Sequence, residues 1–306
     1  MPNCSQHRQA IGASGMAALA TALLLSTAVS AAPYRTSAEI IAAAQAADWR
    51  NLDPQHTLYL ELPTGRVIIE LAPAFAPHTI ANIETLVREH YFDGLAVIRA
   101  QDNYVVQWGD PEGKRKLLSA LPTIKAEFSV PIASQPFTPL PDADGYAPQT
   151  GFSNGLPAAR DPKAGRTWLT HCYGMVGVGR DDDADSGNGA EMYVLIGTAR
   201  LLDRNVTLVG RVLQGIELLS TLPRGTEAMG FYAKPEQYLA IHSVRLASQV
   251  PVAERSALQV LRTDTPLFAE LVEARRNRHD SWTQHPAGYI DVCSIAAPVR
   301  IAPAQP

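Results

Sequence analysis

This sequence has little charge and little scope for metal binding. Of its 306 residues, 18% are Asp, Glu, Lys or Arg, and the formal net charge is −4. A balance this small and slightly acidic provides no basic surface, so we expect no binding to nucleic acid. The eight histidines are scattered without the spacing of metal ligands, and we expect neither a metal ion nor another cofactor.

Long apolar runs are absent from residue 33 onward. No stretch there reaches the ~18 consecutive apolar residues that a membrane-spanning helix needs. The composition, with 46% apolar residues, is that of a soluble globular protein. From residue 33 the chain is long enough for one large domain.

The N-terminus is the exception to this lack of apolar runs. His7 and Arg8 precede an apolar run over residues 11–29, and the small residues 30–32 offer a cleavage site. This pattern predicts a secretory signal peptide over residues 1–32, and therefore export, most simply to the periplasm. A single membrane anchor is the alternative, but no basic residue stands directly after the run. The cleavage point has no cysteine, which argues against a lipoprotein, and we expect no membrane attachment after cleavage.

Cysteine is scarce, with three in the chain. Cleavage of the signal would remove Cys4 and leave Cys172 and Cys293. An oxidising compartment would allow these two to form a disulfide. Two buried free thiols are the alternative, and the sequence does not decide between them.

The region after the signal predicts a short helix, a strand pair and a second helix. Residues 36–47 are mostly good helix formers with a capping residue at the start. Residues 57–62 and 66–71 have strand patterns, and the Pro-Thr-Gly between them predicts a hairpin turn. One face of the following helix is marked by apolar residues at helical spacing: Ile80, Ile83, Leu86 and Val87.

The stretch from Phe92 to Asp110 concentrates the candidate chemistry. Two apolar runs, 95–98 and 104–106, flank a polar turn and predict a second hairpin. Arg99 follows the first run and Gln107 follows the second. Pairing of the two strands would bring these side chains together.

This stretch resembles the signature of the cyclophilin peptidyl-prolyl isomerases, which reads about FHRVIPxFxxQGGD. Ile98 stands where the signature has a histidine, and Trp108 replaces its first glycine. The order of a strand pair, a helix and the arginine hairpin also matches the opening of that family. The signature's other functional positions coincide with Arg99, Gln107, Gly109-Asp110, and Tyr104 in place of a phenylalanine.

The resemblance spans about residues 57–247 and implies a mostly β fold. We expect a closed eight-stranded antiparallel barrel capped by two helices.

Residues 111–170, rich in proline and glycine, lack apolar periodicity for a core of their own and predict long surface loops. The expected organisation is a signal at 1–32, an N-terminal helix and linker at 33–56, a cyclophilin-like domain at 57–250, and a helical extension at 251–306, with helices over 252–262 and 266–276.

The resemblance also implies a substrate site. Arg99 would be the catalytic residue. Glu191 stands where the family has a glutamine and Leu201 where it has a tryptophan. Packing roles are equally open for Val178, Leu201 and Val206. The full set of implied substrate-binding residues is Tyr104, Gln107, Val178, Glu191, Tyr193, Leu201 and Val206.

Two further motifs suggest other chemistry but do not fit it. Residues 151–155 match the G-x-S-x-G of hydrolases, but their flanks predict neither the strand nor the helix that a nucleophile elbow requires. Asp181, Asp183 and Asp185 alternate as in a calcium loop. The following glycine and Glu191 are each displaced by one position from the calcium pattern, which favours a solvated acidic loop.

We therefore expect a peptidyl-prolyl cis-trans isomerase that acts without cofactor, as a monomer, on unfolded or extended proline-containing polypeptides. The alternative is a proline-peptide binding module or holdase with little turnover. The replacements at Ile98, Glu191 and Leu201 favour that alternative. The presence of Arg99 and Gln107 favours the enzyme.

Overall fold

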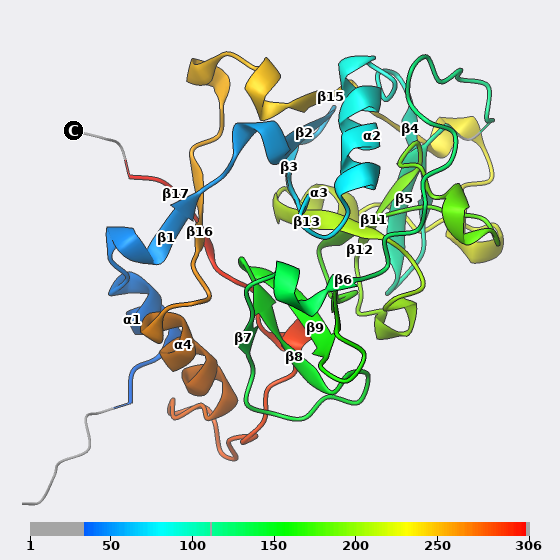
Figure 1. The fold of residues 1–306 in the computed structure, drawn as a ribbon. Helices are drawn as coiled ribbons and strands as arrows, with labels where there is room; N and C mark the ends of the chain where they lie inside the picture. Colours follow the sequence, from blue (N-terminus) through cyan, green and yellow to red (C-terminus); the bar gives the residue numbers. More distant parts are fainter. Residues whose placement is uncertain (1–33, 111, 304–306) are drawn as a thin grey trace, which may run out of the picture. The chain divides into compact units, whose positions relative to one another are not determined.

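A curled antiparallel sheet of nine strands dominates the computed structural model (Figure 1). The structure describes residues 34–110 and 112–303, so the predicted signal peptide lies outside the described residues. The order across the sheet is β14 (Leu239–Ala240), β4 (Ala96–Ala100), β5 (Val105–Gly109), β12 (Met192–Leu195), β11 (Met175–Val178), β13 (Leu208–Gln214), β3 (Gly65–Leu71), β2 (Thr57–Leu62) and β15 (Ser243–Leu246).

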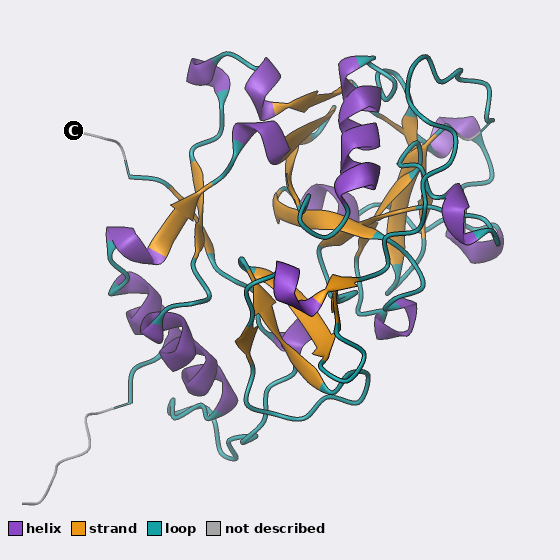
Figure 2. Cartoon of the chain, viewed as in Figure 1, coloured by secondary structure: helices purple, strands orange, loops and turns teal. Residues whose placement is uncertain are grey.

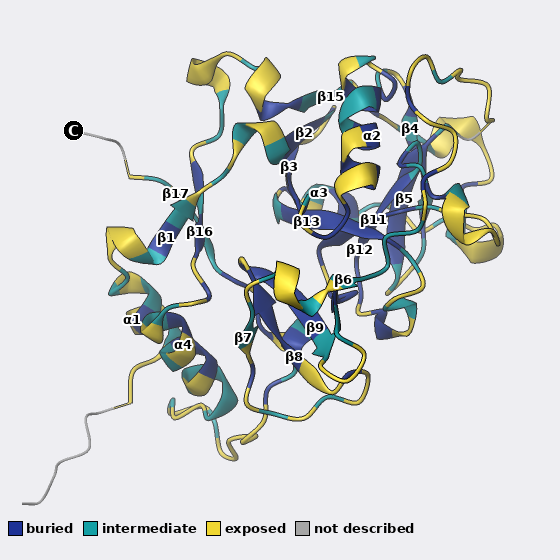
Figure 3. Cartoon of the chain, in the orientation of Figure 1, coloured by how far each residue is buried: buried dark blue, intermediate teal, exposed yellow. Residues whose placement is uncertain are grey.

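The inner face of this sheet encloses an apolar core. Strand alternation directs Leu58, Leu60 and Leu62 of β2 into it. Helix α2 (Pro77–Arg88) adds the four apolar residues predicted as its buried face, and α3 (Glu217–Ser220) adds Leu219. Figure 3 shows the strands largely buried while the outer side of α2 is exposed. Each large aliphatic side chain buried here contributes on the order of 2 kcal/mol.

The predicted closed eight-stranded barrel is not confirmed. The hydrogen-bonded order contains nine strands and has two ends, β14 and β15. Both end strands lie in the single stretch 239–246, which pairs first with β4 and then with β2. Because the chain changes partner after two residues of β14, the ladder is interrupted there, and the result is a curled sheet.

Residues 111–170 contain a second sheet, so the prediction of surface loops is wrong. Asn154 and Gly155 have φ of 50° and 86°, the left-handed conformation of a tight hairpin turn. The G-x-S-x-G motif is this hairpin and is not a nucleophile elbow. The strands, in order across the sheet, are β6 (Val130–Pro131), β10 (Arg166–Leu169), β9 (Leu156–Asp161), β8 (Gln149–Ser153) and β7 (Thr138–Pro139).

The weak apolar pattern of this inserted sheet follows from where it packs. Its Phe152 lies edge-on to Phe268, with ring centroids 5.1 Å apart. Phe268 belongs to α4 (Pro266–Arg276), from the far end of the chain. The inserted sheet thus shares a core with distant segments, including Tyr193 and Leu195 of β12, and needs no complete core of its own.

The C-terminal segment is only partly helical, so the predicted helical extension is not confirmed. Helix α4 forms as predicted, with the Thr265 side chain accepting from the Phe268 N–H at 3.2 Å. The helix predicted over 252–262 is wrong, because that stretch contains β16 (Leu258–Leu261). This strand pairs with β1 (Trp49–Asn51) and β17 (Val299–Ile301), and all three are drawn as strands in Figure 2. Pairing with segments far away in sequence thus outweighs the local helical preference of residues 252–262.

The N-terminal helix is shorter than predicted. Helix α1 (Ser37–Ala42) is capped by Thr36, which forms a reciprocal capping box with Glu39. It packs against α4. No helix within residues 34–110 and 112–303 combines the length and apolar character that crossing a bilayer requires.

A disulfide joins Cys172 to Cys293, with Cα atoms 4.9 Å apart. Cys172 is buried in the core that the inserted sheet shares with α4. The bond therefore ties the C-terminal segment to the loop that leads from β10 into β11.

Candidate active site

A row of four residues crosses four neighbouring strands on the outer face of the nine-stranded sheet. Arg99 of β4 pairs with Gln107 of β5, and Gln107 pairs in turn with Tyr193 of β12. Tyr193 pairs with Gly177 of β11. Antiparallel pairing thus gathers residues from four separate parts of the sequence into one line.

A β-bulge at Ile98 puts Arg99 into this row. Val97 pairs with Trp108 and both face the core, whereas Arg99 pairs with Gln107 and both face outward. Strict alternation would have put Arg99 on the same face as Val97. The extra residue shifts the register, so that Ile98 and Arg99 both line the outer cleft.

Arg99, Gln107 and Tyr193 of this row line a cleft with a volume of about 1080 Å³. Leu201, predicted to bind substrate, is 69% exposed and is not among the lining residues. Its neighbour Leu202 lines the cleft. The other predicted residues all line it: Arg99, Tyr104, Gln107, Val178, Glu191, Tyr193 and Val206.

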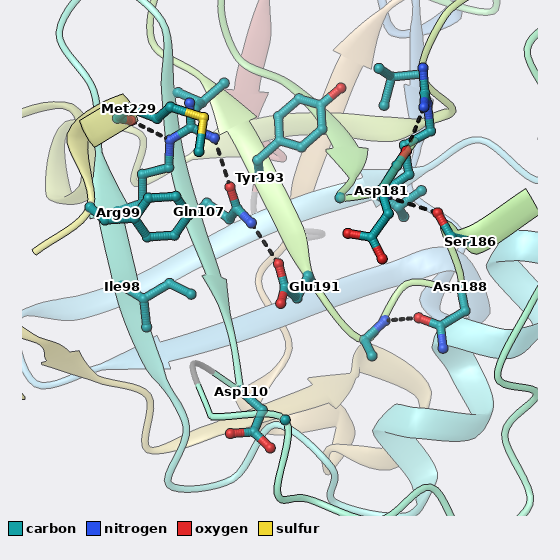
Figure 4. Close-up of a pocket in the computed structure, with 18 of the residues that line it drawn as sticks. Ile98, Arg99, Gln107, Asp110, Asp181, Ser186, Asn188, Glu191, Tyr193 and Met229 are labelled. Atoms are coloured by element: carbon teal, nitrogen blue, oxygen red, sulfur yellow. Dashed lines mark hydrogen bonds between the residues drawn. The ribbon is translucent and has the colours of Figure 1, made fainter. Parts of the chain in front are cut away.

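Arg99 is held by three hydrogen bonds to neutral oxygens, of which Figure 4 shows those to Met229 and Gln107. Its Nε donates to the Met229 carbonyl at 2.6 Å, and Nη1 donates to Gln107 Oε1 at 3.0 Å. Nη2 donates to Gln101 Oε1 at 2.5 Å. The guanidinium carbon also lies 5.5 Å from the centre of the Tyr104 ring and 5.3 Å from that of Phe231. Burial lowers the pKa of Arg99, but an arginine remains charged at neutral pH.

The segment carrying Met229 and Phe231 was missed by sequence analysis. Residues 225–232 run along β4, where the Tyr232 N–H donates to the Ile98 carbonyl at 3.0 Å. Met229 has a φ of 58°, a left-handed conformation that turns its carbonyl toward Arg99. Only the flanking glycines, Gly225 and Gly230, mark a turn there, and no sequence pattern relates this loop to a strand about 130 residues earlier.

Gln107 separates Arg99 from a carboxylate. Its Nε2 donates to Glu191 Oε2 at 2.6 Å, while its Oε1 accepts from Arg99. Glu191 therefore orients the amide of Gln107 without forming an ion pair with Arg99. Burial raises the pKa of the Glu191 carboxyl, and the nearby Asp181 and Asp110 act in the same direction.

This arrangement predicts an acid inflection in the pH profile. Because the pKa of Glu191 is raised, the carboxylate takes up a proton at a higher pH than an ordinary glutamate does. The neutral acid no longer holds the Gln107 amide by a charge-assisted bond, so activity should fall. A Glu191→Gln variant, which does not titrate, should lose the inflection when kcat/KM is measured from about pH 4 to about pH 8. The same inflection in the variant would assign it to another group.

The carboxylates of the acidic loop that follows β11 accept hydrogen bonds from backbone N–H groups. In the described part of the chain, no three His, Cys, Asp or Glu side chains are grouped to hold a metal ion. The Asp183 carboxylate instead accepts from the Asp185 N–H at 3.0 Å, and that of Asp185 accepts from the Ala126 N–H at 2.8 Å. These carboxylates cap backbone groups, and Asp181 faces the cleft (Figure 4).

The chain is similar to known proteins over most of its length. Residues 57–246 match the family model of cyclophilin type peptidyl-prolyl cis-trans isomerases. A probable peptidyl-prolyl cis-trans isomerase of Brucella suis is 27% identical over 180 residues, which cover 58% of this chain and 76% of the relative. Peptidyl-prolyl cis-trans isomerase-like 1 of Bos taurus is 27% identical over 164 residues, covering 53% and 76%. The crystal structure of a cyclophilin from Hirschia baltica is 26% identical and superposes with a TM-score of 0.69, covering 88% of this chain and 99% of that one.

The fold, the cleft and these similarities together define the class of protein: the chain belongs to the cyclophilin family. Within that class it is a peptidyl-prolyl cis-trans isomerase, the activity named for the family and its relatives.

Proposed function

We propose that the cleft binds an X-Pro segment of an extended polypeptide and that Arg99 is the catalytic residue. The proline ring would lie against Tyr104 and Tyr193, between the apolar side chains of Val178, Leu202 and Val206. Gln107 would position Arg99 and contact the substrate backbone. The placement of all of these residues in one cleft supports this proposal.

The reaction requires no nucleophile or proton transfer. Rotation about a peptide bond is opposed by a resonance barrier of about 18–20 kcal/mol. The prolyl nitrogen becomes pyramidal as the bond twists, and a donor aimed at it stabilises the twisted state more than the planar one. A 10⁵-fold acceleration requires about 7 kcal/mol, more than one hydrogen bond supplies. The apolar socket and hydrogen bonds to the flanking peptide groups would therefore supply the rest of this stabilisation of the twisted state.

The observation that carries this assignment is the set of partners of Arg99. A guanidinium has five N–H donors, and three of these donate to neutral protein oxygens. Within the described residues no carboxylate pairs with it, so its charge is not neutralised by the protein. An arginine with this geometry is fixed in place and still has two N–H groups for a substrate.

The direct test is an isomerisation assay with proline-containing peptides on the protein that lacks residues 1–32. We expect the protein to interconvert the cis and trans isomers much faster than the unaided reaction, which takes tens to hundreds of seconds. Peptide binding without any acceleration would leave a binding module and would contradict the proposed mechanism.

We also propose that the natural substrates are exported polypeptides. The pattern of residues 1–32 supports this, and a disulfide is stable in an oxidising compartment. N-terminal sequencing of protein recovered from the cell envelope should give a start near Ala32 or Pro33. Recovery of a chain that still begins at Met1 would argue against cleavage.

A further inference from the structure

Tyr193 occupies space that only a glycine leaves open. Its ring lies across Gly177, its partner on β11, and a Cβ at Gly177 would collide with the outer end of the ring. The backbone of Gly177 does not have a positive φ, so the glycine is required by this close approach and not by the conformation of the chain. The ring therefore leans back over β11, and its hydroxyl is directed away from Arg99 and Gln107 (Figure 4).

The hydroxyl of Tyr193 is hydrogen-bonded to a buried histidine that lies outside the nine-stranded sheet. His171, in the loop that follows β10 of the inserted sheet, has its Nε2 3.1 Å from the hydroxyl oxygen and is 1% exposed. Its Nδ1 lies 3.0 Å from Asp203 Oδ1. Since Nδ1 faces a carboxylate, it carries the proton and donates, and Nε2 accepts from the Tyr193 hydroxyl. Burial lowers the pKa of His171 and raises that of Tyr193, which keeps both groups neutral in these roles.

Two more buried residues, Arg200 and Asp144, hold the Asp203 carboxylate that bonds to His171. Arg200 Nε donates to Asp203 Oδ2 at 2.6 Å, and its two Nη atoms donate to Asp144 at 2.9 and 3.0 Å. The side chains of Arg200, Asp203 and Asp144 are at most 6% exposed. Breaking a buried ion pair is strongly destabilising because it leaves a charge without a partner. The ion pairs of Arg200 therefore fix the Asp203 carboxylate, which in turn holds His171 in one orientation. Asp144 and His171 both lie in or beside the inserted sheet. This sheet therefore supports Tyr193, one of the residues that line the cleft.

We propose that His171 is a positioning residue of the isomerase, and that one role of the inserted sheet is to hold it. His171 pins the Tyr193 ring against Gly177 and so sets the width and the position of the proline socket relative to Arg99. The inference rests on the proposed function of the cleft. It adds a residue that makes no contact with the cleft and acts through Tyr193.

The test compares steady-state isomerisation by Tyr193→Phe, His171→Leu and the double variant. Each single variant should lose about tenfold in kcat/KM, mainly through KM, because the socket contacts the proline in both ground and twisted states. The double variant should be no worse than either single variant, because both remove one shared interaction. His171→Gln, whose amide can donate to Asp203 and accept from Tyr193, should restore most of the loss.

The matched control is Tyr59→Phe, which removes another buried tyrosine hydroxyl. Tyr59 accepts from the Ser256 N–H at 2.9 Å and does not line the cleft. It should lower the melting temperature without changing KM, which separates lost stability from lost positioning. A Tyr193→Phe variant with wild-type kcat and KM would overturn the inference, as would additive losses in the double variant. Either result, in a protein whose wild type still isomerises proline peptides, leaves the proposed function standing.

Discussion

An Arg99→Ala variant is expected to lose at least about 10²-fold in isomerisation rate while it unfolds at nearly the wild-type temperature. A donor preorganised toward a transition state typically contributes this much to kcat. Arg99 lies in a cleft, and its three partners are neutral oxygens. Its removal therefore leaves no buried carboxylate without a counter-charge, and stability should change little. Peptide affinity should fall less than rate, because the apolar socket is intact.

Arg99→Lys should fail almost as fully as the alanine variant. An ammonium lacks the planar fork that donates to Met229, Gln107 and Gln101 at once, so it cannot be held in the same place. The measurements are single-turnover rates with a proline peptide and thermal melts of both variants. Arg88→Ala, which removes an exposed arginine from α2, is the matched control and should retain the wild-type rate. An Arg99→Ala variant as active as wild type would place the catalytic group elsewhere.

Replacing Cys172 and Cys293 together by serine is expected to destabilise the protein by about 4 kcal/mol. The disulfide closes a loop over a sequence separation of 121, and the stabilisation by such a cross-link grows with loop length. For a chain of this size the melting temperature should fall by roughly 10 °C. Neither cysteine lines the cleft, so the folded variant should still isomerise proline peptides at low temperature.

Thermal melts with and without reductant provide the measurement. Reductant should lower the melting temperature of the wild type and leave the double serine variant unchanged. Thiol counting on denatured, unreduced protein that lacks residues 1–32 should find no free thiol. Two free thiols would show that the two cysteines are not bridged in solution.

The sequence by itself determined the hairpins and helices whose signals are local. The β2–β3 pair follows from two strand patterns and a turn sequence between them, and α2 follows from apolar residues at helical spacing. The Arg99 hairpin, with Arg99 opposite Gln107, could be predicted for the same reason. Turn chemistry and periodicity act within about ten residues, so they can be recognised without knowing the rest of the fold.

Only the tertiary structure decided the elements whose partners are distant. The helical prediction for 252–262 failed because strands from both ends of the chain flank β16. The inserted sheet was missed because its core is completed by α4 and β12. In both cases the stabilising burial and hydrogen bonds come from segments far away in sequence, and a local pattern carries no record of them.

The same division applies to the site. The residues predicted for the site from the sequence line the cleft, apart from Leu201. The bulge at Ile98, which turns Arg99 outward, could not, because a register shift depends on how two strands meet across the sheet. The Met229 carbonyl and the His171 support were equally hidden, since both reach the site from loops that only the folded chain brings there. Side chains supply the chemistry of this cleft, and long-range packing sets their positions.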